Sequence, residues 1–290
     1  NHLITSQVEH PAILEVCRYL AKEGIETTYL PVDAKGTVDP DAVASAIRPK
    51  TILITIMHAN NEVGTLQPIA EISRIAHDHN ILMHTDAAQS AGKIATRVDE
   101  LGVDFLSIAG HKLYAPKGVG ALYIREGVYI EKFCHGAGQE AGRRAGTENV
   151  MGIAALGEAC GLAEAAGKER TAHLSATRNR LEESLLGKLN EIQINGNLSS
   201  RLPNTSSISF KGLAADRILE EIGLCVAASA GAACHSDTVQ ISHVLEAMGV
   251  LPAWAKGTVR FSTGAFTSLS QIDEAVQIVT GAIKTLRSAR

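Results

Sequence analysis

The chain has 290 residues, of which 45% are hydrophobic, and a formal net charge of −4. This length fits one large and one smaller domain, and the weak acidic balance gives no indication of the basic face that a nucleic-acid-binding protein needs. No run approaches the ~18 uninterrupted apolar residues of a membrane span, so we expect no membrane partner.

Strand-like and helix-like stretches alternate along the first half of the chain. The predicted strands are 3–6, 26–30, 51–57, 81–85, 103–109 and 118–124, and the predicted helices begin at Pro11, Pro40 and Pro68. A proline favours the first position of a helix, where its missing N–H costs nothing. Strands separated by helices of about ten residues predict βαβ units and a mostly parallel sheet.

The second half has a different character, which begins at Met151. Two long amphipathic helices, 152–166 and 169–189, meet near Gly167. Beyond them we predict strands at 206–210, 224–228 and 258–262, and helices at 214–222 and from Ser242 and Gln271. The pattern predicts an α/β fold with a mostly parallel sheet and helices on both faces, comprising a large domain, 1–166, and a small C-terminal α+β domain, 167–290.

Two polar residues follow neighbouring apolar strands. Lys112 comes after the run 103–109, and Asp86 comes after 81–85, with Gln89 close behind. Ligands collect at the carboxyl ends of the strands in open α/β sheets. An amine for a Schiff base and a carboxylate for the pyridine nitrogen are what pyridoxal 5′-phosphate requires. Taken singly, such a lysine is more often a solvated loop residue, and such an aspartate a helix cap.

The five cysteines show neither a C-x-x-C pair nor another zinc spacing. This favours a reducing compartment, here the cytoplasm, and argues against a disulfide or metal framework. Cys234 lies among tiny residues, and we expect an exposed, mobile loop there, with His235 favouring the thiolate. The apolar patterns around three others are typical of buried, inert cysteines: Cys17, Cys160 and Cys225. Cys134 falls in the long loop 133–149, a length that favours a functional or mobile segment.

Arg260 is a charged residue in the middle of the predicted strand 258–262. The planar guanidinium fits a carboxylate, which is either that of a structural ion pair or that of a substrate. The presence of a lysine, an aspartate and a mobile cysteine in the same chain favours the substrate.

Seven short signatures together resemble the NifS/IscS-type cysteine desulfurases and the related selenocysteine lyases, which are fold-type I pyridoxal phosphate enzymes of the class V aminotransferase group. The signatures span essentially the whole chain: Val8-Glu9-His10, 58–64, 84–90, Gly110-His111-Lys112, 144–149, 231–236 and 259–262. The resemblance implies a cysteine desulfurase that converts L-cysteine to L-alanine.

The same resemblance implies a role for each matching residue. Lys112 would hold the cofactor covalently, Asp86 would pair with its pyridine nitrogen, and Cys234 would take the substrate sulfur as a persulfide. The remaining implied contacts are His10 stacked on the ring and moving protons, Gln89 at the ring oxygen, His111 at the phosphate, Thr147 at the phosphate bound by the partner subunit, and Asn61 beside the cofactor, where it binds the substrate carboxylate with Arg260.

The implied partners are a second copy of the chain in a homodimer and a sulfur acceptor such as an iron–sulfur scaffold or a thiolation protein. Two departures from the family pattern stand out. Ala109 replaces a serine that donates to the phosphate in many members, and the glycine-rich Ala-Thr-Glu turn for the phosphate is expected in an N-terminal part missing before Asn1.

Three alternatives stand beside this interpretation. A selenocysteine lyase has a similar cysteine loop. A non-catalytic fragment or partner-binding protein that lacks the phosphate loop would retain the same residues without activity. An ordinary aminotransferase is disfavoured because it has no use for such a cysteine.

Overall fold

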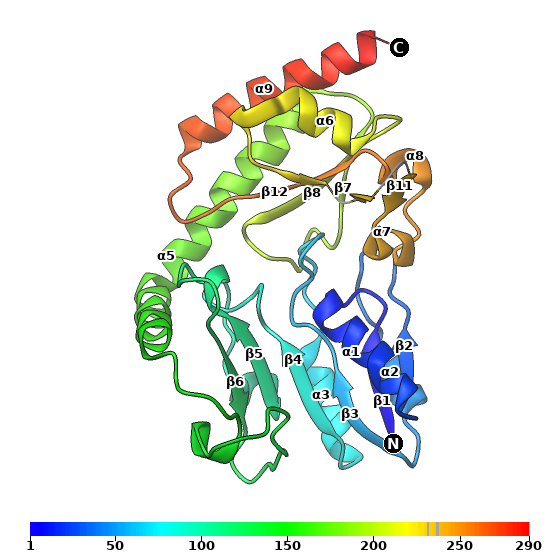
Figure 1. Ribbon diagram of the computed structural model, residues 1–290. Helices are drawn as coiled ribbons and strands as arrows, with labels where there is room; N and C mark the ends of the chain where they lie inside the picture. The colour runs from blue at the N-terminus through cyan, green and yellow to red at the C-terminus, as the bar shows by residue number, and fades with distance from the viewer. Residues whose placement is uncertain (231, 236–237, 290) are drawn as a thin grey trace.

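A six-stranded sheet forms the framework of the first half of the chain (Figure 1). The computed structural model describes residues 1–230, 232–235 and 238–289, of which 232–235 and 238–240 are described by their backbone. The strands lie in the order β2-β1-β3-β4-β5-β6. Their bounds are β1 (His2–Ser6), β2 (Glu26–Leu30), β3 (Thr51–Thr55), β4 (Leu82–Asp86), β5 (Phe105–Ala109) and β6 (Gly120–Ile124). All neighbours pair in parallel except β6, which runs antiparallel to β5. The predicted mostly parallel sheet is confirmed.

The helices of this half begin where the sequence signals predict. They are α1 (Pro11–Lys22), α2 (Pro40–Ala46), α3 (Ile69–Asp78) and the short α4 (Val98–Leu101), which the sequence did not predict. The Asp39 side chain caps α2 by accepting from the Asp41 amide. Fully buried side chains of strands and helices form one core, including Ile4, Ile54 and Met83 from the sheet and Val43 and Ile72 from the helices. Burial of such side chains stabilises each by about 1.5–3 kcal/mol.

The second half forms a smaller antiparallel sheet covered by helices. Its strands lie in the order β7 (Ile192–Asn195), β8 (Thr205–Phe210), β12 (Thr258–Ser262) and β9 (Ser229–Ala230). The helices α6 (Ala215–Ile222) and α9 (Leu269–Ser288) pack on it together with the end of α5 (Val150–Lys188), through a core that includes Leu185, Phe210 and Val276. Two short helices, α7 (His243–Ala247) and α8 (Pro252–Ala255), complete this half.

Helix α5 connects the two halves (Figure 1). Gly167 interrupts it with φ 32° and ψ −118°, a left-handed conformation that favours glycine, so the prediction of two helices joined at this residue is confirmed. By length and composition alone, α5 is long and apolar enough to cross a membrane, and 22% of its apolar window is buried in the protein; one such helix is weak evidence for a span. Its side chains Leu156, Ala159 and Ala163 pack against Leu113.

The structure corrects the prediction between residues 224 and 230. Gly223 ends α6 and starts a 3-10 turn, η3 (Gly223–Cys225), so Leu224 and Cys225 are exposed and not part of a strand. Only Ser229–Ala230 reach β12 and pair with it. The segment predicted as a loop around Cys234 contains two paired antiparallel strands, β10 (Ala232–His235) and β11 (Thr238–Ile241). An apolar run alone does not say which neighbour will accept its hydrogen bonds.

Candidate active site

Four parallel strands of the large sheet end at one edge, and a predicted site residue lies at or after the end of each. His10 comes after β1, Asn61 after β3 and Lys112 after β5, while Asp86 is the last residue of β4. These residues line one cavity of about 370 Å³ together with three more predicted site residues, Gln89, His111 and Arg260. The volume lies in the range of small-molecule sites.

Lys112 and Asp86 are placed by adjacent strands. Asp86 lies in register with Ser107 of β5, and Lys112 sits in a 3-10 turn, η1 (Gly110–Lys112), directly after that strand. A Cβ atom at Gly110 would lie 2.8 Å from the Val119 carbonyl oxygen, so the tight turn requires glycine. One carboxylate oxygen of Asp86 accepts from the Ala88 amide at 2.8 Å. The other oxygen accepts no hydrogen bond from any described residue, and Asp86 lines the cavity.

His10 is fixed at the start of α1. Its Nδ1 atom accepts a hydrogen bond from the Ala12 amide at 3.1 Å, which makes His10 the N-cap of the helix. Because Nδ1 acts as the acceptor, the neutral ring carries its proton on Nε2. The ring thus has a defined tautomer at the rim of the cavity.

Arg260 reaches the cavity from the small sheet. Its guanidinium donates to the Asn61 carbonyl at 2.9 Å and to the Ser229 hydroxyl at 3.2 Å. No salt bridge of Arg260 occurs among the described residues, and its buried Nε has no hydrogen-bond partner there. Buried donors are normally paired. The unpaired donor favours an anionic ligand over the structural ion pair considered from the sequence.

A buried acid that sequence reasoning missed lies directly behind the site. Glu9 accepts hydrogen bonds from the Ser6 hydroxyl at 2.7 Å and from the Met57 amide at 2.9 Å. Burial raises the pKa of Glu9 to about 8, and the nearby charge of Asp86 adds to this effect. The sequence feature that could have identified Glu9 is its place beside His10 in the signature Val8-Glu9-His10.

The raised pKa of Glu9 predicts a pH-dependent stability. The unfolded group has a pKa near 4.5, so the folded protein holds one proton more between about pH 4.5 and 8. The free energy of unfolding should therefore fall as the pH rises through this window. In Glu9→Gln this pH dependence disappears. From pH 5 to pH 8, the free energy of unfolding of the wild type should therefore fall relative to that of the variant by on the order of a few kcal/mol.

Urea unfolding of the cofactor-free protein at both pH values measures this difference. Glu71→Gln, a change at an exposed glutamate on α3, is the matched control and should follow the wild type at both. An equal difference between Glu9→Gln and wild type at pH 5 and pH 8 would contradict the assignment.

Contacts of Ser242 and His243, which sequence reasoning missed, fix the end of β11 beside the site. The Ser242 hydroxyl caps α7 and donates a short hydrogen bond to Glu62, and His243 Nε2 lies 3.0 Å from the Glu9 carbonyl. Burial raises the pKa of Glu62, whereas the Ser242 hydrogen bond and the charge of His243 lower it. The strand that follows Cys234 in the chain is thus anchored beside the cavity.

Of the predicted site residues whose side chains the structure describes, Thr147 alone is not among those that line the cavity. Thr147 is exposed in the loop 133–149, which contains the 3-10 turn η2 (Glu140–Gly142). Cys234 belongs to β10, and its side chain lies outside the described residues. Of the other cysteines, Cys17 is buried, Cys160 is half-buried, and Cys134 and Cys225 are exposed. The prediction that Cys225 is buried is therefore wrong, because the turn after α6 directs it outward.

The cavity fits pyridoxal phosphate chemically. It holds an amine, a carboxylate with one oxygen that no described residue binds, and a half-buried guanidinium, which match the aldehyde, the pyridine nitrogen and the carboxylate of an amino acid. Ala109 also lines it, so the serine hydroxyl of many relatives is lacking there. The nearby Ser107 hydroxyl is bonded to His84 at 2.9 Å.

Comparisons with known proteins point to one family. Residues 1–275 match the family described as Aminotransferase class-V. The chain is 46% identical over 289 residues to "Cysteine desulfurase IscS" of Dictyoglomus turgidum, covering 99% of this chain and 73% of that protein. It is 44% identical over 289 residues to the protein of the same name from Methanosarcina thermophila, covering 99% and 71%.

Two solved structures have the same fold. A structure titled "NIFS-LIKE PROTEIN" superimposes with a TM-score of 0.88 at 34% identity and covers 98% of this chain and 75% of that one. A second, "SspA in complex with cysteine", has a TM-score of 0.76 at 36% identity and covers 92% and 74%.

Proposed function

The chain belongs to the Aminotransferase class-V family, and from this premise we propose that it is a pyridoxal phosphate-dependent cysteine desulfurase. It converts L-cysteine to L-alanine and transfers the sulfur to Cys234 as a persulfide. The observation that carries the proposal is the convergence of Lys112, Asp86 and Arg260 on one cavity. The relatives that are 42–46% identical carry the name cysteine desulfurase, which favours this activity over that of a selenocysteine lyase.

The cofactor, when bound, supplies an electron sink for the negative charge that develops on the substrate α-carbon. Lys112 would hold it through its amine, and the Asp86 carboxylate would keep the pyridine nitrogen protonated. His10 would pack on the ring, Gln89 would contact the ring oxygen, and His111 would contact the phosphate. All five side chains line the same cavity, which supports this assignment.

The substrate is oriented by the small domain and the loop after β3. Arg260 binds the carboxylate of L-cysteine through the donors that it turns to the cavity, and Asn61, whose carbonyl holds the guanidinium, lies beside it. His10 carries protons at Nε2, the atom that its N-cap contact leaves free. Cys234 takes the sulfur from the substrate, so carbon and sulfur chemistry are divided between two nucleophiles.

Assembly and delivery are further parts of the proposal. We propose a homodimer in which Thr147 contacts the phosphate bound by the partner subunit, since Thr147 is exposed and does not line the cavity of its own chain. The persulfide is then passed to an acceptor such as an iron–sulfur scaffold or a thiolation protein. We also propose a cytoplasmic location, because the cysteine spacings predict no disulfide framework and so favour a reducing compartment.

An absorbance spectrum tests the proposed function. The purified protein, supplied with pyridoxal phosphate and then freed of excess, should show a visible band that changes when L-cysteine is added, with release of sulfide under reductant. L-Alanine should appear in equal amount. A protein that stays colourless after the cofactor is supplied would be the non-catalytic partner-binding protein instead.

A further inference from the structure

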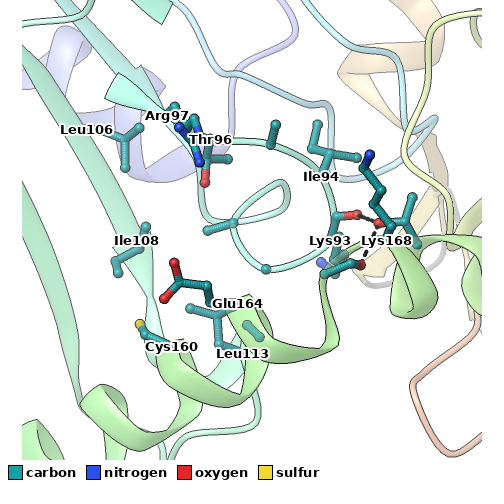
Figure 2. Close-up of a pocket in the computed structure, with 16 residues that line it drawn as sticks. Lys93, Ile94, Thr96, Arg97, Leu106, Ile108, Leu113, Cys160, Glu164 and Lys168 are labelled. Atoms are coloured by element: carbon teal, nitrogen blue, oxygen red, sulfur yellow. Dashed lines mark hydrogen bonds between the residues drawn. The ribbon is translucent and has the colours of Figure 1, made fainter. Parts of the chain in front are cut away.

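Lys93 lies in the wall between two cavities. The first is the candidate active site, lined by Gln89. The second, of about 600 Å³, lies between the turn after β4, strand β5 and the first half of α5, and Figure 2 shows it with Leu106 and Ile108 on one side and Cys160 and Glu164 on another. Lys93 lines this second cavity but makes its side-chain contacts with Gln89, a residue of the first.

Both ends of Lys93 are held. Its Nζ atom donates to the Gln89 carbonyl at 2.7 Å and lies 3.3 Å from the Gln89 side-chain oxygen, Oε1. Its own carbonyl accepts from the Thr171 hydroxyl at 2.8 Å, and the Thr171 hydroxyl also donates to the carbonyl of Gly167, the residue at which α5 breaks. The lysine therefore connects the active-site turn to the joint between the two halves of the chain.

Among the described residues, no carboxylate neutralises the charge of Lys93. No salt bridge of this half-buried residue occurs in the part of the chain that the structure describes. Burial, followed by the positive charges of Lys112 and Arg260, lowers the pKa of Lys93 to about 8. A cation retained next to two others is poorly explained by fold stability alone.

We propose that Lys93 is a positioning residue for Gln89, an inference that rests on the proposed function. An ammonium group can only donate hydrogen bonds, so it fixes the amide with Oε1 toward Lys93. The amide nitrogen, Nε2, is then left as a donor toward the active-site cavity, where it makes no hydrogen bond to any described residue. Lys93 thus selects a donor for the anionic ring oxygen of the cofactor and places a positive charge behind it.

The proposal predicts a change in the absorbance titration of the bound cofactor. A donor and a positive charge near the ring oxygen both favour the form with one proton fewer, so Lys93→Met should raise the midpoint of this titration by about one pH unit. The shift applies below about pH 8, where Lys93 is charged. The other titratable or charged groups that face the cavity stay in place in this variant: His10, Asp86, His111, Lys112 and Arg260.

The test compares five variants of the cofactor-loaded protein with the wild type: Lys93→Met, Lys93→Arg, Lys168→Met, Gln89→Leu and the double variant of Lys93→Met with Gln89→Leu. Lys93→Met should raise the midpoint, and Lys93→Arg, which keeps the charge and the donors, should restore most of the wild-type value. Lys168→Met removes a lysine that lines the same second cavity but is not bonded to Gln89, so its midpoint should match the wild type. Because Lys93 acts partly through Gln89, Lys93→Met should shift the midpoint less in a Gln89→Leu background than alone.

The outcomes separate this inference from the proposed function. A wild-type visible band with an unshifted Lys93→Met midpoint, in a variant that melts like the wild type, overturns the inference and leaves the proposed function intact. An equal shift in Lys168→Met also overturns it, because the effect would then be general. If the wild type forms no visible band, the proposed function fails and the role of Lys93 fails with it.

Discussion

Replacing Lys112 with alanine should remove the visible absorbance of the cofactor-loaded protein and lower the rate of L-cysteine turnover by at least about a thousandfold. The amine of Lys112 is the group that would link to the cofactor, and the other residues that line the cavity offer no second lysine. A cofactor retained by Asp86, Gln89 and His111 alone would be held without a covalent link. Its spectrum should then resemble that of the free aldehyde, which anaerobic spectra with and without L-cysteine will show.

Lys117 provides the matched control for this substitution. It lies five residues further along the chain, is exposed, and does not line the cavity. Lys117→Ala should therefore retain both the wild-type spectrum and the wild-type rate. A normal visible band in Lys112→Ala would refute the role of Lys112 and would direct attention to another amine.

The positions of the strand ends could be predicted because they follow from the pattern of apolar residues within a few positions of each end. The run 103–109 is apolar, and the structure places β5 at Phe105–Ala109 with Lys112 in the turn that follows. In a parallel sheet, such ends lie at one edge, so topology predicts that Lys112 and Asp86 lie at the same edge, where both line the cavity. The family signatures added the identities of His10 and Gln89, which periodicity could not supply.

The missed residues depend on contacts between distant segments. Lys93 is held by Thr171, which lies 78 positions further on. Arg260 itself was predicted, but its contact with the Asn61 carbonyl, across 199 positions, was not. Nothing near Lys93 in the sequence indicates which helix will pass beside it. Glu9 was missed for a related reason, because its burial follows from the Met57 amide of another strand end, 48 positions away. Local pattern predicts where a side chain lies in its element, but it does not predict which polar partner the fold supplies.

The residue with the second largest expected effect is Cys234. Cys234→Ala should leave the visible band of the loaded protein unchanged, since Lys112 and Asp86 lie on the large sheet and do not depend on it. The rate of sulfide release from L-cysteine should nevertheless fall by at least about a hundredfold, because the substrate sulfur then has no thiolate to attack it. Labelling of protein persulfide, followed by mass spectrometry, locates the sulfur directly.

Cys225→Ala is the control for this experiment, because Cys225 is an exposed cysteine of the same domain and is not among the residues lining the active-site cavity. It should keep the wild-type rate and the wild-type persulfide label. Selenocysteine supplies a second comparison, since selenium leaves more readily than sulfur. A Cys234→Ala variant that processes selenocysteine normally but not cysteine agrees with a desulfurase whose thiol is needed for sulfur alone. Sulfide release at the wild-type rate from Cys234→Ala would show that another group accepts the sulfur.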